Sequence, residues 1–142
     1  IPPGTVGKLS KKIKLGTKSV ESVKCREDVD FEEEIVIPLE TPVRVRPQTS
    51  ITFRYYIKDA NKFRYGFKGK DSKGKRLDAG YLKIGYAQRQ WNVLTVKVNQ
   101  LKSSRGIRVK EGAQIEKVYF LAGFKGEESR AVLYVDDIKI TP

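Results

Sequence analysis

Two neighbouring segments of the chain interleave aromatic and basic side chains at a spacing of two residues. In SITFRYYIK, Tyr56 stands between Arg54 and Lys58, and in KFRYGFKG the residues Arg64 and Lys68 occupy equivalent positions. An arginine fork makes paired hydrogen bonds with carboxylate, sulfate or phosphate, and a tyrosine offers a flat ring and a hydroxyl. If the two segments pair as a hairpin, one sheet face carries both features, and we expect that face to bind a ligand.

Further aromatic and basic residues extend this candidate binding set, namely Tyr81, Lys83, Trp91 and Tyr119. Trp91 is the only tryptophan and has two interpretations. It packs against the edge of the fold, because the residues that follow it are apolar, or it stacks on a ligand. The whole face also has a plainer interpretation as a solvated surface, on which Arg and Lys discourage pairing with other chains.

Histidine is absent from the 142 residues, which removes the commonest general base and the commonest neutral metal ligand. Catalysis by Ser-His-Asp or Cys-His groups is therefore excluded within this chain, and it has no glycine-rich phosphate loop or nucleophile elbow. Acidic residues cluster between positions 27 and 34, but as a run and not as a pair set across a cleft. We expect a protein that is not an enzyme.

The charge is the outstanding feature of the composition. The chain has 29 basic and 17 acidic residues and a formal net charge of +12, which favours anionic partners. Two segments, 68–76 and 102–110, are especially rich in Lys and Arg. We interpret both as solvated loops whose attraction for anions is long-range and sensitive to salt. The alternative for the whole excess is solubility alone.

Apolar and polar residues alternate with a period of two through most of the chain from residue 35 onward. The alternation predicts about eight short strands, with no helix, and therefore an antiparallel β-sandwich of the jelly-roll kind. Pro38 and Pro42 are expected to interrupt the first long extended segment. Residues 1–19 are expected to be a basic linker or weak first strand, and residues 20–142 a single domain. The inward-facing aromatic residues are predicted to be Phe53, Tyr55, Phe63, Tyr65, Phe67 and Phe120.

Three segments together carry a resemblance: TPVRVRPQTSITFRYYIKDANKFRYGF, QWNVLTVKVNQL and IEKVYFLAGFKGEESRAVLYVDDIKI. They resemble the galactose-binding-like jelly-roll sandwiches, a group that includes many carbohydrate-binding modules. Trp91 matches a strand that begins with tryptophan, and residues 134–138 match a last strand with a hydrophobic–Asp–Asp–hydrophobic ending. The resemblance covers roughly residues 35–142 and bears more on fold than on function.

The resemblance implies an accessory domain of an extracellular or cell-surface protein, or of a periplasmic one, that binds glycans through aromatic and polar side chains. Many such modules hold a structural calcium ion. By that resemblance Asp136 and Asp137 are candidate calcium ligands, with a partner carboxylate near the domain start from Glu21, Glu27 or Asp28. The alternative is that the two aspartates simply mark the exposed end of a strand.

The favoured function is therefore binding of carbohydrate, with an acidic or sulfated polysaccharide as the ligand because of the basic excess. The first alternative is a structural or protein-interaction sandwich without a glycan ligand. The second is a nucleic-acid-binding domain, which is weaker because the chain is long for a five-stranded OB barrel. No apolar run is long enough to span a membrane. Because methionine is absent, also at position 1, we expect neighbouring domains of a longer chain.

Overall fold

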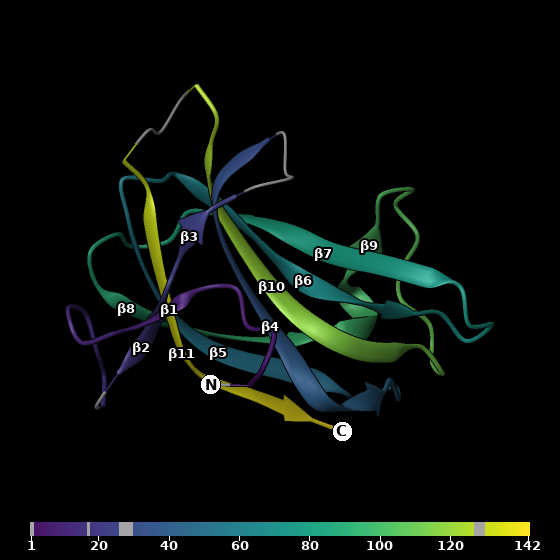
Figure 1. Cartoon of the computed structure of the whole chain (residues 1–142). Coiled ribbons are helices and arrows are strands. Elements are labelled where there is room, and N and C mark those ends of the chain that lie inside the picture. The colour runs from purple at the N-terminus through teal and green to yellow at the C-terminus, as the bar shows by residue number, and fades with distance from the viewer. Residues whose placement is uncertain (1, 17, 26–29, 127–129) are drawn as a thin grey trace.

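The computed structural model describes the chain except residues 1, 17, 26–29 and 127–129. Within this part, eleven strands form two antiparallel sheets that pack face to face (Figure 1). This confirms the predicted all-β sandwich. It has more strands than the eight expected, because four strands of two or three residues are too short to show an alternation. No helix in the described ranges is long and apolar enough to cross a membrane.

The five-stranded sheet contains, in spatial order, β1 (Lys8–Ser10), β2 (Ser19–Glu21), β11 (Val132–Thr141), β5 (Ser50–Lys58) and β8 (Trp91–Lys97). The six-stranded sheet contains β3 (Val23–Lys24), β4 (Phe31–Arg44), β10 (Gln114–Phe124), β6 (Lys62–Lys70), β7 (Arg76–Ile84) and β9 (Lys102–Ser103). A short 3-10 turn, η1 (Val98–Gln100), lies between β8 and β9. The chain changes sheet from β2 to β3, from β4 to β5, from β5 to β6, from β7 to β8, from β8 to β9 and from β10 to β11.

The core lies between the two sheets and is built from the residues that the alternation assigns to it. Phe53, Phe63, Phe67 and Phe120 are at most 1% exposed, as predicted. Phe53 of the five-stranded sheet joins the layers, with its ring 4.9 Å from that of Phe120 and 5.4 Å from that of Tyr65. Because successive side chains on a strand point to opposite faces, the residues directly before and after each of these phenylalanines lie on the outer faces.

Strand β4 continues through both prolines, but its pairing with β10 is interrupted between them: Pro38 is opposite Lys117 and Val43 is opposite Ile115, so residues 39–42 fall outside the register. The expected interruption is therefore a bulge in the ladder and not an end of the strand. The strand can continue because β4 lies near one edge of its sheet. On the side away from β10, it pairs with β3 only at Glu33 and Glu34, and an isolated bridge joins Val36 to Val6. Proline is tolerated where a strand has no ladder to donate to.

The N-terminal segment supplies short strands to both sheets. Residues 8–10 form β1, which pairs with β2, whereas β3 joins the other sheet beside β4. The Lys24 ammonium lies 3.4 Å from a carboxylate oxygen of both Glu32 and Glu33. Part of the acidic cluster therefore pairs with a basic residue of the neighbouring strand. Glu27 and Asp28 lie outside the described residues.

Candidate ligand-binding site

The four residues of the expected hairpin face lie on two different sheets. Strand β5 pairs with β11 and β8, whereas β6 pairs with β10 and β7. The expected pairing of β5 with β6 is therefore wrong. Arg54 and Tyr56 lie on the outer face of the five-stranded sheet, and Arg64 and Lys68 lie on the outer face of the six-stranded sheet.

Tyr81 and Lys83 do not extend either outer face. In the register of β6 and β7, Tyr81 is opposite Tyr65 and Lys83 is opposite Phe63, so both share the face of core residues. Tyr81 is nevertheless 53% exposed, with its ring 6.0 Å from that of Tyr65. The expectation that they extend the face of Arg64 is wrong. Alternation along β7 places both side chains on the face that packs toward the core, where Tyr81 remains exposed.

Tyr119 does share a face with Arg64 and Lys68, and the three line a hollow of about 870 Å³ on the outer face of the six-stranded sheet. We call this hollow the Tyr119 groove. One end, which we call the apolar end, is formed by Phe31, Leu121 and Phe124, with the acidic residues Asp30 and Glu34 beside them. The other end is polar and is formed by Arg64, Lys68, Asp78 and Lys117. Such a surface, apolar with a few placed polar groups, is typical of a small-molecule site.

The polar end of the groove is organised around the Tyr119 hydroxyl. This hydroxyl accepts a hydrogen bond from Arg64 Nε at 3.1 Å and donates one to Asp78 Oδ1 at 2.8 Å. Burial and the neighbouring Asp78 raise the pKa of Tyr119, so the hydroxyl keeps its proton and remains a donor. The network leaves other guanidinium hydrogens of Arg64 and the second carboxylate oxygen of Asp78 for contacts with a ligand.

Two glycines make room for this arrangement. Gly66 of β6 is paired with Gly80 of β7, directly beneath the Tyr119 side chain. A Cβ atom at Gly66 would lie 2.8 Å from Tyr119 Oη, and one at Gly80 would lie 2.6 Å from it. Both distances are closer than real contacts allow. The absence of side chains at this pair therefore lets the tyrosine lie across two strands and reach Asp78.

The opposite side of the sandwich carries a separate aromatic row. Tyr134, Tyr56 and Trp91 are register neighbours on β11, β5 and β8. The Tyr56 ring is 5.8 Å from Trp91 and 5.9 Å from Tyr134, both edge to face. Next to the row, Arg54 Nε lies 3.5 Å from a carboxylate oxygen of Asp137. Trp91 is thus half-buried against a neighbouring ring, and both of its interpretations, as a packing residue and as a stacking residue, stay predictions.

The three candidate calcium ligands are engaged separately. Glu21 is 2.9 Å from the Lys8 ammonium, and Asp137 pairs with Arg54. Asp136 Oδ1 accepts the backbone N–H of Asp137. Among the residues that the structure describes, no three His, Cys, Asp or Glu side chains gather as a metal-binding group. A calcium ion at this end of β11 stays a prediction.

Comparison with known proteins bears on the fold. No protein-family model and no curated protein matches the sequence. The structure is similar to the family 11 carbohydrate-binding module of the cellulosomal cellulase Lic26A-Cel5E of Clostridium thermocellum, with a TM-score of 0.64 and 16% identity over 96% of this chain and 80% of that one. A family 30 carbohydrate-binding module gives a TM-score of 0.65 and 14% identity over 99% and 76% of the two chains. The chain has the jelly-roll fold of these carbohydrate-binding modules.

A family 11 module from Clostridium thermocellum has also been solved in complex with a β-1,3-1,4-mixed-linked tetrasaccharide, and it matches with a TM-score of 0.64 and 15% identity over 96% of this chain and 81% of that one. The resemblance noted in the sequence is therefore confirmed at the level of fold. Sequence identities this low do not transfer a ligand from these modules to the present chain. The ligand must therefore be inferred from the surface of the chain itself.

Several residues of the Tyr119 groove were missed by sequence reasoning, in particular Asp78, Lys117 and the apolar end. Gly66 and Gly80 were the available signal, because an isolated glycine inside a strand often marks a close approach of another group. Asp78 follows the segment 68–76, which we interpreted as a loop, and it lies within β7. An acidic residue next to a supposed basic loop gave no reason to place it beside Tyr119.

Proposed function

We propose that this domain is a non-catalytic carbohydrate-binding module whose ligand occupies the Tyr119 groove. The observation that carries the proposal is the Arg64–Tyr119–Asp78 network, set in a hollow on a sheet of a carbohydrate-binding-module fold. Sugar hydroxyls donate to carboxylates and accept from guanidinium groups, and the apolar faces of sugar rings pack on apolar side chains. The groove offers both kinds of surface within one hollow.

The three basic residues of the polar end, set against the single carboxylate of Asp78 there, favour an acidic or sulfated polysaccharide as the ligand, whereas Asp30 and Glu34 lie at the other end of the groove. Lys68 and Lys117 are exposed at the polar end of the groove, beside Arg64. The Lys68 ammonium lies 5.8 Å from the centre of the Tyr119 ring, where a cation is attracted by the ring face. Carboxylate or sulfate groups on a sugar chain are partners for these cations. A role in glycan binding also implies that the domain works outside the cell, at the cell surface or in the periplasm.

Paired substitutions on the two sheets test the site. Arg64→Ala should abolish binding in a glycan array, because it removes the guanidinium that holds the Tyr119 hydroxyl and faces the groove. Arg54→Ala is the matched control, since it makes the same change on the other sheet and should leave glycan binding within about twofold of the original protein. Loss of binding in Arg54→Ala and not in Arg64→Ala would move the site to the other sheet. Incubation with any bound oligosaccharide should release no shorter product.

The aromatic row on the five-stranded sheet favours a second candidate function, contact with a neighbouring domain or protein. Val93 lies beside this row, opposite Arg54, and is 57% exposed. Aromatic residues are enriched in the buried centres of protein interfaces. If no glycan binds, Trp91→Ala should weaken association with a neighbouring domain or protein, measured by cross-linking.

A further inference from the structure

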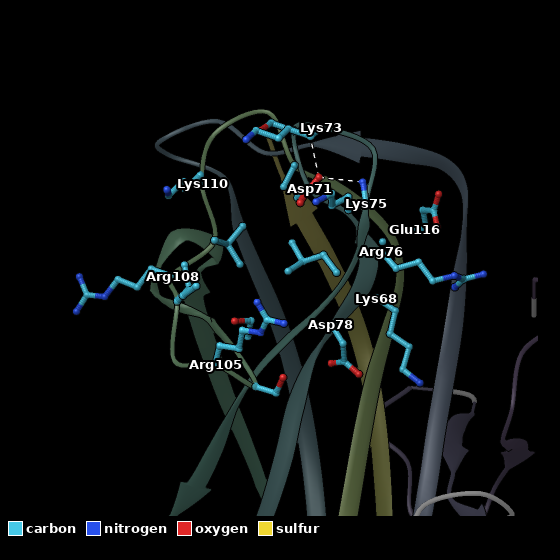
Figure 2. A pocket seen from close by; sticks show the side chains of 18 of the residues that line it. Lys68, Asp71, Lys73, Lys75, Arg76, Asp78, Arg105, Arg108, Lys110 and Glu116 are labelled. Carbon is cyan, nitrogen blue, oxygen red and sulfur yellow. Dashed lines mark hydrogen bonds between the residues drawn. The ribbon is translucent and has the colours of Figure 1, made fainter.

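Two basic turns that are distant in sequence meet at one end of the six-stranded sheet. They are the β6–β7 turn, residues 71–75, and the segment 103–110 that follows β9. Together they line a pocket of about 840 Å³, which we call the basic pocket (Figure 2). Four of its cations belong to the first turn and its strands: Lys68, Lys73, Lys75 and Arg76. Four more come from the second segment and β10: Arg105, Arg108, Lys110 and Lys117. Against these eight basic residues stand three acidic ones, so the lining carries an excess of five positive charges.

Backbone hydrogen bonds hold the first turn in place, while residues 72–75 are exposed to solvent, as expected from sequence. The Asp71 carboxylate accepts the N–H groups of Lys73 and Lys75, both at 2.9 Å. Gly74 adopts a φ of +82° and donates to the Asp71 carbonyl at 3.0 Å. This conformation is open to glycine at no steric cost. The lysines therefore extend from a defined turn.

The second segment is ordered in the same way. Ser103 N–H donates to the Ile107 carbonyl at 2.9 Å, and Val109 N–H donates to the Leu101 carbonyl at 3.0 Å. Val109 is buried, at 5% exposure, and anchors the segment in the core. A Cβ atom at Gly112 would lie only 3.1 Å from the Ser72 side chain, so the end of this segment packs on the first turn. The two groups of cations thus have a fixed relation to one another.

Within the described residues, the cations of the basic pocket outnumber the acidic residues around them by eight to three, although the backbone N–H groups and the charges of Lys75 and Lys73 lower the pKa of Asp71. In the part of the chain that the structure describes, no ion pair involves any of the eight. The three acidic residues already have other partners. Asp71 binds backbone N–H groups, Asp78 binds the Tyr119 hydroxyl, and Glu116 lies 3.9 Å from Lys70. Unpaired like charges on a common scaffold attract anions to the site.

The spread of the cations indicates a ligand with several charges. Figure 2 shows Lys68 and Arg76 extending to one side of β7, and Arg108 and Lys110 extending to the other side. A single small anion reaches only part of this set, whereas a chain with repeated anionic groups reaches most of it. No Phe, Tyr or Trp lines the basic pocket. Single-stranded nucleic acid is bound through base stacking on such rings, so this lining favours another polyanion.

The basic pocket is continuous with the Tyr119 groove, because both are lined by Lys68, Asp78, Ser104 and Lys117. We infer that the basic pocket binds the sulfate or carboxylate substituents of the polysaccharide whose adjacent sugar residues occupy the groove. This inference rests on the proposed function and deepens it: the groove recognises the sugar and the pocket recognises its charge. The polysaccharide is then bound in a single orientation: its most anionic portion lies at the β6–β7 turn, and the adjacent sugar residues lie in the Tyr119 groove.

The first test measures binding to matched polymers by affinity electrophoresis, with dextran sulfate and dextran, sulfated and desulfated galactan, and polygalacturonate and its methyl ester. The charged member of at least one pair should bind at least about tenfold more tightly at about 50 mM salt, and the difference should shrink at about 500 mM. The double variant Lys73→Gln/Lys75→Gln should lose this difference. The matched control, Lys11→Gln/Lys14→Gln, removes the same charge from the other side of the molecule and should keep it.

The second test uses sucrose octasulfate as a small probe and follows the backbone amide signals by NMR. Shifts in residues 71–76 and 103–110 are expected, and shifts confined to other surfaces would overturn the inference. If the uncharged polymers bind and their charged partners bind no better, the proposed function stands and the basic pocket has no part in it. If no polymer binds, the proposed function fails. Tighter binding of duplex DNA than of every sulfated polymer, lost in Lys73→Gln/Lys75→Gln, would reassign the pocket to nucleic acid.

Discussion

Replacing Tyr119 by phenylalanine tests the network on which the groove depends. The change removes one oxygen atom, which accepts from Arg64 at 3.1 Å and donates to Asp78 at 2.8 Å, and leaves a ring that is 3% exposed. A hydrogen bond to a charged group contributes about 1.5–3 kcal/mol. Arg64 is half-buried and Asp78 exposed, so water replaces part of what each loses. We therefore expect the two bonds together to contribute about 1–2 kcal/mol to the free energy of unfolding.

For a domain of this size, that loss lowers the melting temperature by about 3–6 °C. Thermal and urea unfolding, followed by circular dichroism, measure it. The control is Tyr81→Phe on β7, which removes a hydroxyl from a side chain that is 53% exposed and should change stability by less than about 0.5 kcal/mol. Equal stability of the two variants would refute the assignment of the network as a stabilising element.

The Tyr119→Phe variant also tests whether the Arg64–Tyr119–Asp78 network contributes to ligand binding or only to the stability of the fold. If the hydroxyl also positions Arg64 and Asp78 for a glycan, Tyr119→Phe should weaken glycan binding by about tenfold, because both charged groups lose their fixed orientation. The affinity is compared by calorimetry, well below the melting temperature of the variant. A destabilised protein with unchanged affinity would show that the network supports the fold and that the ligand contacts other residues of the groove.

Three further predictions concern other parts of the molecule. Gly80→Ala should destabilise the domain by about 2 kcal/mol and displace the Tyr119 side chain, because the new Cβ meets both its hydroxyl and a backbone carbonyl; Gly16→Ala, with open space around it, is the control in urea unfolding. Burial raises the pKa of Glu21, but hydrogen bonds from Lys8 and Tyr134 outweigh it and hold the pKa below its ordinary value of 4.5. Glu21 then stabilises the fold above that pH and loses the effect as the pH falls, so Glu21→Gln should cost about 1–2 kcal/mol at neutral pH and progressively less in melts below pH 4. If calcium is bound at the end of β11, a chelator should lower the melting temperature and excess calcium restore it; identical melts would remove the ion.

The side of each strand that faces the core could be predicted from sequence, because it depends only on alternation along that strand. Phe53 and Phe63 were assigned correctly on this basis. Which sheet a strand joins depends on contacts that are distant in sequence. The connection between β5 and β6 is short enough for a hairpin, yet Ala60 is held there by Gln88, which accepts its N–H, and by Tyr86, which donates to its carbonyl. These partners belong to the connection between β7 and β8, and they cannot be predicted from the residues around position 60.

The site was harder to predict than the fold for a related reason. Arg64, Lys68 and Tyr119 were among the expected binding residues, but they were grouped with Arg54 and Tyr56 from the opposite sheet. A groove on a sheet takes its residues from several strands, so an error in pairing changes its membership even when every face is assigned correctly. Composition alone gives no help here, because Arg and Tyr also occur on the outer face of the five-stranded sheet.

The distribution of charge favours one of the two interpretations of the net charge of +12, the attraction of anions, over solubility alone. Basic residues that serve solubility alone need not cluster on the surface. Clustering is unfavourable, because like charges held close together raise the electrostatic free energy of the folded state. The β6–β7 turn, the segment after β9 and the adjoining strands nevertheless place eight basic side chains around one pocket. None of the eight takes part in the ion pairs of the described residues. Asp71 and Val109 hold these turns in place, so the repulsion cannot be relieved by simple fraying of a loop. An anionic ligand removes this repulsion on binding, and its contribution should therefore be largest at low salt, where the repulsion is least screened.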